Sequence, residues 1–168
     1  MNHPFIKAQI NIQASRDKVW DAWTTESGAK TFFAPDCRID LRPGGAYEMY
    51  FKPSADPGLR GGKGMIILSV QPEKMLSFTW NAPPHLPEAR EQMTHVTIRF
   101  SEIDADLTNV RLYHDGWGSG GEWDEAFQYF NEAWKLVVLP RLAFRFEHGP
   151  VDWESPPDPS ALERYISK

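Results

Sequence analysis

Histidine is the side chain with the widest chemical use in this sequence, and the chain contains five, namely His3, His85, His95, His114 and His148. No two of them have the i, i+4 spacing with which a helix presents a pair of imidazoles to zinc. Because Cys37 is the only cysteine, an internal disulfide and a cysteine cage for zinc are also not expected. We therefore expect no metal site, and the sequence points to no catalytic residue.

His114 differs from the other histidines because it shares a face of an expected strand with Val110 and Leu112. An imidazole on that face would be poorly solvated, and desolvation disfavours its charged form. We predict a neutral ring at pH 7, with a pKa below the ordinary value of ~6.5. Two interpretations stay open, namely a core histidine bonded to the backbone and a polar ligand contact at the floor of a cavity.

Residues 116–121, Gly-Trp-Gly-Ser-Gly-Gly, formally match the dinucleotide-binding pattern G-x-G-x-x-G. That pattern works within a strand-helix-strand unit, where the helix is followed by a second strand. No strand is expected after the helix that follows these glycines. We interpret them as the hinge that directs the last helix, and we expect no cofactor.

Aromatic side chains make up 13% of the chain, which is the most unusual feature of its composition. Four of them, Trp123, Phe127, Phe130 and Trp134, recur at helical spacing and form one apolar stripe. Their expected partners on strands are also large or flexible, namely Tyr47, Met49, Phe51, Phe78 and Trp80. Rings that converge on rings often leave shaped gaps. The stripe is therefore either plain core or the wall of a cavity, and with His114 these residues are the candidate ligand-binding set.

The overall charge and hydropathy exclude several classes of protein. The net charge is −5, from 18 basic and 23 acidic residues, which argues against the positive footprint needed for nucleic acid. No apolar run approaches the ~18 residues that span a bilayer. The first 20 residues lack the apolar stretch of a signal peptide. We expect a cytoplasmic protein that binds neither nucleic acid nor a membrane.

The expected positions of these candidate residues follow from the predicted order of strands and helices along the chain. Residues 5–13 alternate between apolar and polar side chains, as a half-buried strand does. Two short helices are expected between Ser15 and Phe33. Five more strands are predicted at residues 46–51, 64–70, 75–80, 94–103 and 107–114, with an exposed loop at 81–92.

A long helix is expected after Gly121, because the aromatic stripe continues from Trp123 to Val138. Pro140 should kink this helix or end it near Leu139, since proline lacks the amide hydrogen of a regular helix. A meander of strands must cover one apolar face, and this helix is the only expected element long enough to do so. The predicted architecture is α+β, with a curved antiparallel sheet of about six to seven strands wrapped around the C-terminal helix.

The sequence resembles the SRPBCC (START-like) superfamily, and within it the group named after the activator of heat-shock-protein-90 ATPase homologue. Four stretches carry the resemblance in the family's order, namely Val19-Trp20-Asp21-Ala22-Trp23-Thr24, Phe33-Ala34-Pro35 with Asp40-Leu41-Arg42-Pro43-Gly44-Gly45, Leu76-Ser77-Phe78-Thr79-Trp80 and Leu112-Tyr113-His114-Asp115-Gly116-Trp117. The resemblance implies a helix-grip (START/Bet v 1-like) fold with a deep cavity between sheet and helix. It covers residues 5–146, so we expect one domain over 1–146 and an extended, proline-rich appendage over 147–168.

Three functions are compatible with this resemblance. The preferred one is a small-molecule binding protein that holds an apolar or amphipathic ligand in the aromatic cavity. The first alternative is an enzyme of the cyclase or hydrolase type, which would need His114 and a polar partner such as Tyr47 or His95 in the cavity. The second alternative is a chaperone-associated interaction module. The sequence leaves open whether the protein is a monomer or a homodimer.

Overall fold

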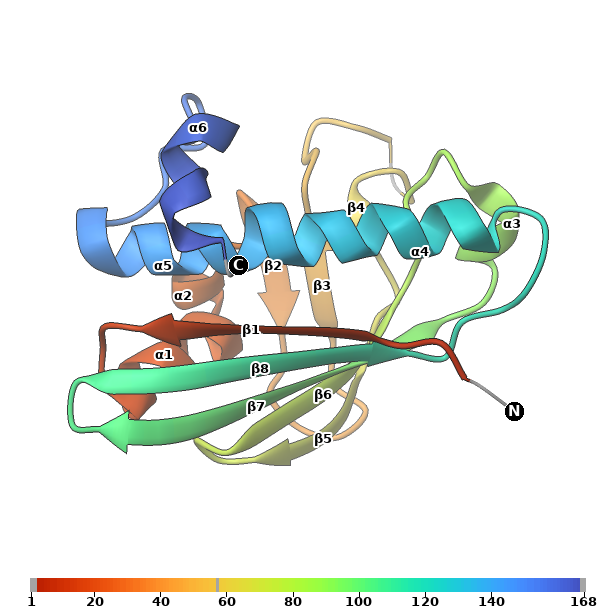
Figure 1. Ribbon diagram of the computed structural model, residues 1–168. Helices are drawn as coiled ribbons and strands as arrows, with labels where there is room; N and C mark the ends of the chain where they lie inside the picture. The colour runs from red at the N-terminus through yellow and green to blue at the C-terminus, as the bar shows by residue number, and fades with distance from the viewer. Residues whose placement is uncertain (1–2, 57, 167–168) are drawn as a thin grey trace.

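Two antiparallel sheets and one long helix form most of the structure, a computed structural model that describes residues 3–56 and 58–166. The larger sheet has five strands in the order β1-β8-β7-β6-β5 (Figure 1). Their bounds are Ile6–Ile12 for β1, Ile67–Gln71 for β5, Met75–Trp80 for β6, Thr94–Asp104 for β7 and Leu107–Asp115 for β8. The smaller sheet contains β2 (Asp36–Ile39), β3 (Tyr47–Tyr50) and β4 (Gly61–Gly62). A bridge between Ala46 and Ile66 joins the two sheets.

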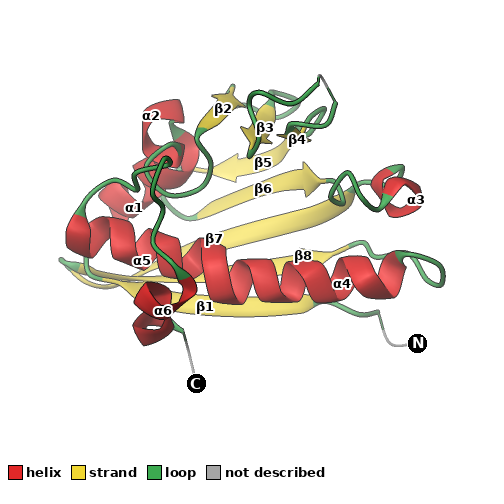
Figure 2. Ribbon diagram, turned by 90° about the horizontal axis from the view of Figure 1, so that it is seen from above, coloured by secondary structure: helices red, strands yellow, loops and turns green. Residues whose placement is uncertain are grey.

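The C-terminal helix runs from Trp123 to His148 and lies across one face of the larger sheet (Figure 2). It consists of α4 (Trp123–Glu132), a π-helical segment η1 (Ala133–Val138) and α5 (Leu139–His148). The short helices α1 (Arg16–Thr24) and α2 (Glu26–Ala29) follow β1, as expected. The arrangement confirms the α+β helix-grip fold, with five strands in the main sheet and the others in the small one.

Strict alternation in the sheet places one row of side chains under the helix. Ile6 of β1 pairs with His114 of β8, which pairs with Val96 of β7, and Val96 pairs with Phe78 of β6. All four residues are buried. The apolar period of two therefore puts His114 in a row that is otherwise hydrocarbon.

Several described elements were not expected from the sequence, and strand β2 and one short helix are examples. Strand β2 has only one fully buried residue, Cys37, so it carries no alternation signal and depends on its pairing with β3. Helix α3 (Pro87–Arg90) lies in the segment expected to be a loop. Its proline stands in the first turn, where the missing amide hydrogen has no cost, and a proline-rich composition alone does not reveal that use.

Pro140 does not end the C-terminal helix, which continues for a further eight residues to His148. A regular α-helix would press the proline ring against the carbonyl of Leu136 and leave that carbonyl without its usual donor. The preceding turn is wider instead, and the amide of Leu139 donates to the carbonyl of Trp134, five residues back. Of the two outcomes expected at Pro140, a kink or an ending near Leu139, the ending does not occur because this π-helical turn accommodates the proline.

The segment after Gly149 folds back over the helix. The amide of Val151 donates to the carbonyl of Thr31, and the indole N–H of Trp153 donates to the carbonyl of Lys30. It then forms α6 (Pro159–Leu162) and the 3-10 turn η2 (Glu163–Tyr165), beside α5 in Figure 1. The boundary expected at residue 146 lies inside α5.

Candidate functional site

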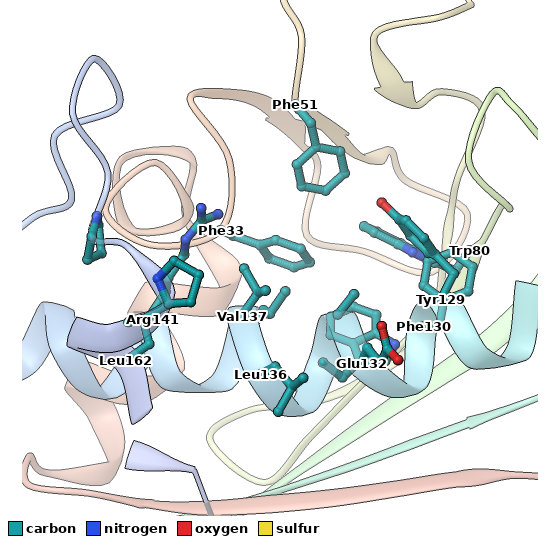
Figure 3. A pocket seen from close by; sticks show the side chains of 15 residues that line it. Phe33, Phe51, Trp80, Tyr129, Phe130, Glu132, Leu136, Val137, Arg141 and Leu162 are labelled. Carbon is teal, nitrogen blue, oxygen red and sulfur yellow. The ribbon is translucent and has the colours of Figure 1, made fainter. Parts of the chain in front are cut away.

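A cavity of about 550 Å³ lies beside the π-helical segment of the C-terminal helix. Every residue of η1 except Lys135 lines it, so the wide turn that accommodates Pro140 also forms one wall. The opposite wall comes from the ring of Phe33, after α2, and from Trp80 at the end of β6 (Figure 3). Phe51 and the C-terminal segment, through Pro157, Pro159 and Leu162, line other parts of it.

Aromatic rings form a continuous wall of this cavity. Phe33 and Trp80 stack with ring centroids 5.6 Å apart, and Trp80 and Trp134 are also 5.6 Å apart. Phe51 contacts the edge of the same group at 6.4 Å from Trp80. Rings at these distances and tilts attract one another, so they hold a defined apolar surface rather than a fluid one.

A second hollow of about 450 Å³ shares four wall residues with the first. These are Phe51, Trp80, Tyr129 and Phe130. Arg90 anchors its far side by donating to the carbonyls of Ala82, Gly58 and Gly61. The guanidinium of Arg90 therefore holds these loops together through its hydrogen bonds.

The ten candidate ligand-binding residues fall into three groups. Four of them line the cavity, namely Phe51, Trp80, Phe130 and Trp134. Four are packed in the core, namely Tyr47, Met49, Phe78 and His114. The remaining two, Trp123 and Phe127, lie around Trp117 at the start of the helix, with centroid distances of 6.3 and 5.2 Å.

The four core residues do not line the cavity but pack behind its wall. Tyr47 stacks on Phe78 at 4.3 Å, and its hydroxyl donates to the carbonyl of Trp23 at 2.8 Å. The hydroxyl of Tyr47 thus has a hydrogen-bond partner inside the protein, and its ring is packed against another ring. Phe78 in turn packs against Trp80, and Trp80 lines the cavity.

His114 is fully buried, and both of its ring nitrogens have partners. The indole N–H of Trp134 donates to Nδ1 at 3.0 Å, so Nδ1 carries no proton. Nε2 lies 2.6 Å from the hydroxyl of Thr94, which itself donates to the carbonyl of Trp80 at 3.0 Å. Nε2 must therefore hold the proton and donate to Thr94. This chain of hydrogen bonds connects two cavity-wall residues, Trp134 and Trp80, through the core.

Burial lowers the pKa of His114 to about 3, with a smaller contribution from the charge of His95. The direction is the one expected from the sequence, because a charged imidazole in this row would lose its hydration without gaining a carboxylate. His114 does not border either of the two cavities. Its visible role is to orient Trp134.

Sequence reasoning did not find several residues that line the cavity. The sequence indicates Phe33 as the end of a short helix and as part of a family motif but not as a wall residue, and Tyr129 lies beside the aromatic stripe rather than on it. Arg141 lies just beyond the position where the helix was expected to kink or end, and Leu162 lies in the segment expected to be a C-terminal appendage. The available signal was Pro140 within a helical pattern, because such a proline is compatible with a locally widened helix.

The polar side chains of the cavity wall are few and lie at separate ends. Arg141 is at one end, and the Tyr129 hydroxyl and the Glu132 carboxylate are at the other (Figure 3). Across residues 3–56 and 58–166, no three His, Cys, Asp or Glu side chains are gathered as a metal site requires. Within the same residues no helix is long and apolar enough to cross a membrane.

Comparison with solved structures gives the same fold at low sequence identity. The Aha1 dimer from Colwellia psychrerythraea aligns with a TM-score of 0.65 and 22% identity, over 87% of this chain and 98% of that one. PFC0360w, an HSP90 activator from Plasmodium falciparum, aligns with a TM-score of 0.60 and 13% identity, over 80% and 90%. DynU16, from the dynemicin biosynthetic locus, aligns at 0.63 and 20%, over 87% of this chain but only 48% of its own.

Searching the curated proteins finds no match to this sequence. A family model does match, namely that of the activator of Hsp90 ATPase homolog 1-like proteins, and it covers residues 13–146. The match begins just after β1 and runs from α1 through most of α5, so it includes the other strands of both sheets, most of the long helix and most of the cavity wall. The chain therefore belongs to the activator of Hsp90 ATPase homolog 1-like family.

Proposed function

We propose that this protein binds a small apolar or amphipathic molecule in the aromatic cavity beside η1. The observation that carries the proposal is a cavity of about 550 Å³ whose wall is mostly aromatic and aliphatic, with few polar groups. Its volume lies within the ~300–1,000 Å³ typical of small-molecule sites, and its composition has the usual apolar majority. π-helical turns are also frequent at functional sites, and one forms a wall here.

Binding is favoured over catalysis because the best acid–base candidate is occupied elsewhere. His114 is neutral, buried and hydrogen-bonded at both nitrogens, and it does not border the cavity. General acid–base catalysis requires a group within hydrogen-bond reach of the substrate. Tyr47, the partner suggested for it, donates its hydroxyl proton to the Trp23 carbonyl.

The proposal is tested by filling the cavity from within. Val137 lines it and is half-buried, so Val137→Trp should place an indole in the space a ligand would take. Gln128→Trp adds the same side chain at an exposed position of the same helix that borders neither described cavity. We expect the neutral dye Nile red to bind the wild type and Gln128→Trp alike, and Val137→Trp at least about tenfold more weakly.

Circular dichroism melts would verify that both variants are folded. Equal binding of the dye by Val137→Trp and the wild type would place the dye outside this cavity and contradict the proposal. Native mass spectrometry of freshly purified protein provides an independent measurement. A co-purifying small molecule should be retained by Gln128→Trp and absent from Val137→Trp.

A further inference from the structure

Arg141 is a cation in the wall of an apolar cavity, and no residue in the described part of the chain pairs with its charge. Its side chain is half-buried, and its Nε–H is buried without a hydrogen-bond partner among the described residues. The one interaction that the structure gives it is with the ring of Trp153, whose centroid is 5.2 Å from the guanidinium carbon. A buried donor left unpaired is costly, so its retention in a cavity wall needs an explanation.

Within residues 3–56 and 58–166, no carboxylate forms a salt bridge with Arg141. Asp158 lies between two cavity-lining prolines, but its carboxylate accepts from the amide of Ala161 and the hydroxyl of Ser160 and so caps α6. Glu132 lines the far end of the cavity, nine residues earlier on the same helix. At ~1.5 Å per residue the two side chains start roughly 13 to 14 Å apart along the axis. Burial also lowers the pKa of Arg141, and no neighbouring carboxylate opposes that shift.

We propose that the ligand of this cavity is an amphipathic carboxylate whose anionic group pairs with Arg141 and whose apolar body lies against Trp80 and Phe130. This inference rests on the proposed binding function and adds the chemical class and the orientation of the ligand. A planar guanidinium matches a carboxylate with two parallel hydrogen bonds, which are stronger than neutral ones. Glu132 at the opposite end repels an anion and therefore favours the same orientation.

The position of Trp153 makes Arg141 a defined partner rather than a mobile one. The indole N–H of Trp153 donates to the carbonyl of Lys30 at 2.6 Å, which holds the ring in place. The guanidinium lies against that ring. A guanidinium that stacks through its face keeps its edge N–H groups available for an acceptor. Figure 3 shows Arg141 at the opposite end of the cavity from the Tyr129 hydroxyl.

The test compares ligands that differ only in charge. The probes are three pairs, each a carboxylic acid and its primary amide, with naphthyl, biphenyl and decyl bodies, measured by titration calorimetry at pH 7.5. The wild type should bind at least one acid about tenfold or more tightly than its amide, the range expected for a charge-assisted pair. Arg141→Gln should bind that acid and its amide equally, with the amide affinity unchanged.

Arg145→Gln is the matched control. It removes the same charge one helical turn later, from a residue that also has a buried Nε–H but does not line a described cavity. It should keep the preference for the acid. Arg141→Lys, which keeps the charge but not the planar fork, should keep part of it and covers the case in which Arg141→Gln fails to fold.

Two results would overturn the inference while leaving the binding function intact. One is equal binding of acids and amides by the wild type, and the other is an acid preference that survives in Arg141→Gln. Failure of all six probes to bind the wild type, together with a negative Nile red titration, would instead count against the cavity as a binding site and against this inference with it.

Discussion

His114 shows how one buried polar residue can serve a site that it does not touch. Its hydrogen bonds run from the indole of Trp134 through the imidazole and Thr94 to the carbonyl at Trp80. Each donor in this chain has one acceptor, so the direction of every proton is determined. The cavity wall therefore gains a preferred orientation of Trp134 from a residue in the sheet.

The depressed pKa of His114 predicts a specific dependence of stability on pH. The folded-state pKa of about 3 lies below the unfolded value of ~6.5, so the unfolded chain binds a proton more readily between these values. The contribution to stability is complete above pH ~6.5 and falls by roughly 1.4 kcal/mol per pH unit as pH decreases below it. Urea melts at pH 5 and 7.5 should show a smaller difference in unfolding free energy for His114→Gln than for the wild type.

The imidazole itself can be followed in the same samples. NMR of the ring nitrogens should show the Nε2–H tautomer with no titration between pH 5 and 8. A midpoint near 6 or above would contradict the buried neutral ring, and so would identical pH dependence in the two proteins.

At the scale of elements, the site depends on the irregular middle of the C-terminal helix and on the segment that folds back over it. The π-helical turn before Pro140 widens the helix where five of its residues line the cavity. Helix α6 has only four residues, yet it contributes Leu162 and Pro159 to the wall of that cavity. A helix this short is not stable alone and is held by packing.

Two leucines allow the contribution of a cavity-wall residue to stability and dye binding to be compared with that of a core residue. Leu142 of α5 is fully buried away from the cavities, so Leu142→Ala should lower the unfolding free energy by about 3–4 kcal/mol. Leu162 borders existing space, so Leu162→Ala should cost only about 1–2 kcal/mol and should weaken Nile red binding. Urea melts and dye titrations measure both effects. Equal losses of stability with unchanged dye binding would show that α6 does not form part of the binding site.

At the scale of the whole molecule, stability should be distributed unevenly. Strands β7 and β8 are paired on both sides within the main sheet, whereas α6 and the two-residue strand β4 lie at the periphery. Local opening needs less free energy where fewer buried contacts are lost. Native-state hydrogen exchange should therefore find amides of β7 and β8 exchanging only through global unfolding.

The amides of α6 should exchange on the order of a hundredfold faster than those of β7 and β8 under the same conditions. A ligand in the cavity should slow the exchange in α6 preferentially, since it would contact Leu162 and the flanking prolines. Protection of α6 as strong as that of β8 would contradict this distribution.

The sequence by itself determined the main sheet, the long helix and the family. Alternation in β1, β7 and β8 is a local property of the chain, and it placed Ile6, Val96 and His114 on the buried face without any tertiary information. Helical spacing likewise placed Phe130 and Trp134 on the inner face of the helix. The ordered motifs around Trp20, Phe33, Trp80 and His114 indicated the family that the comparison shows.

Only the tertiary structure decided which aromatic residues border space and which fill it. Phe78 and Trp134 are both almost completely buried, yet Phe78 packs in the core and Trp134 lines the cavity. The difference lies in what stands opposite each ring, and that depends on contacts between segments far apart in the chain. Arg141 and Leu162 joined the site for the same reason, because the π-helical turn continued the helix and the C-terminal segment returned across it.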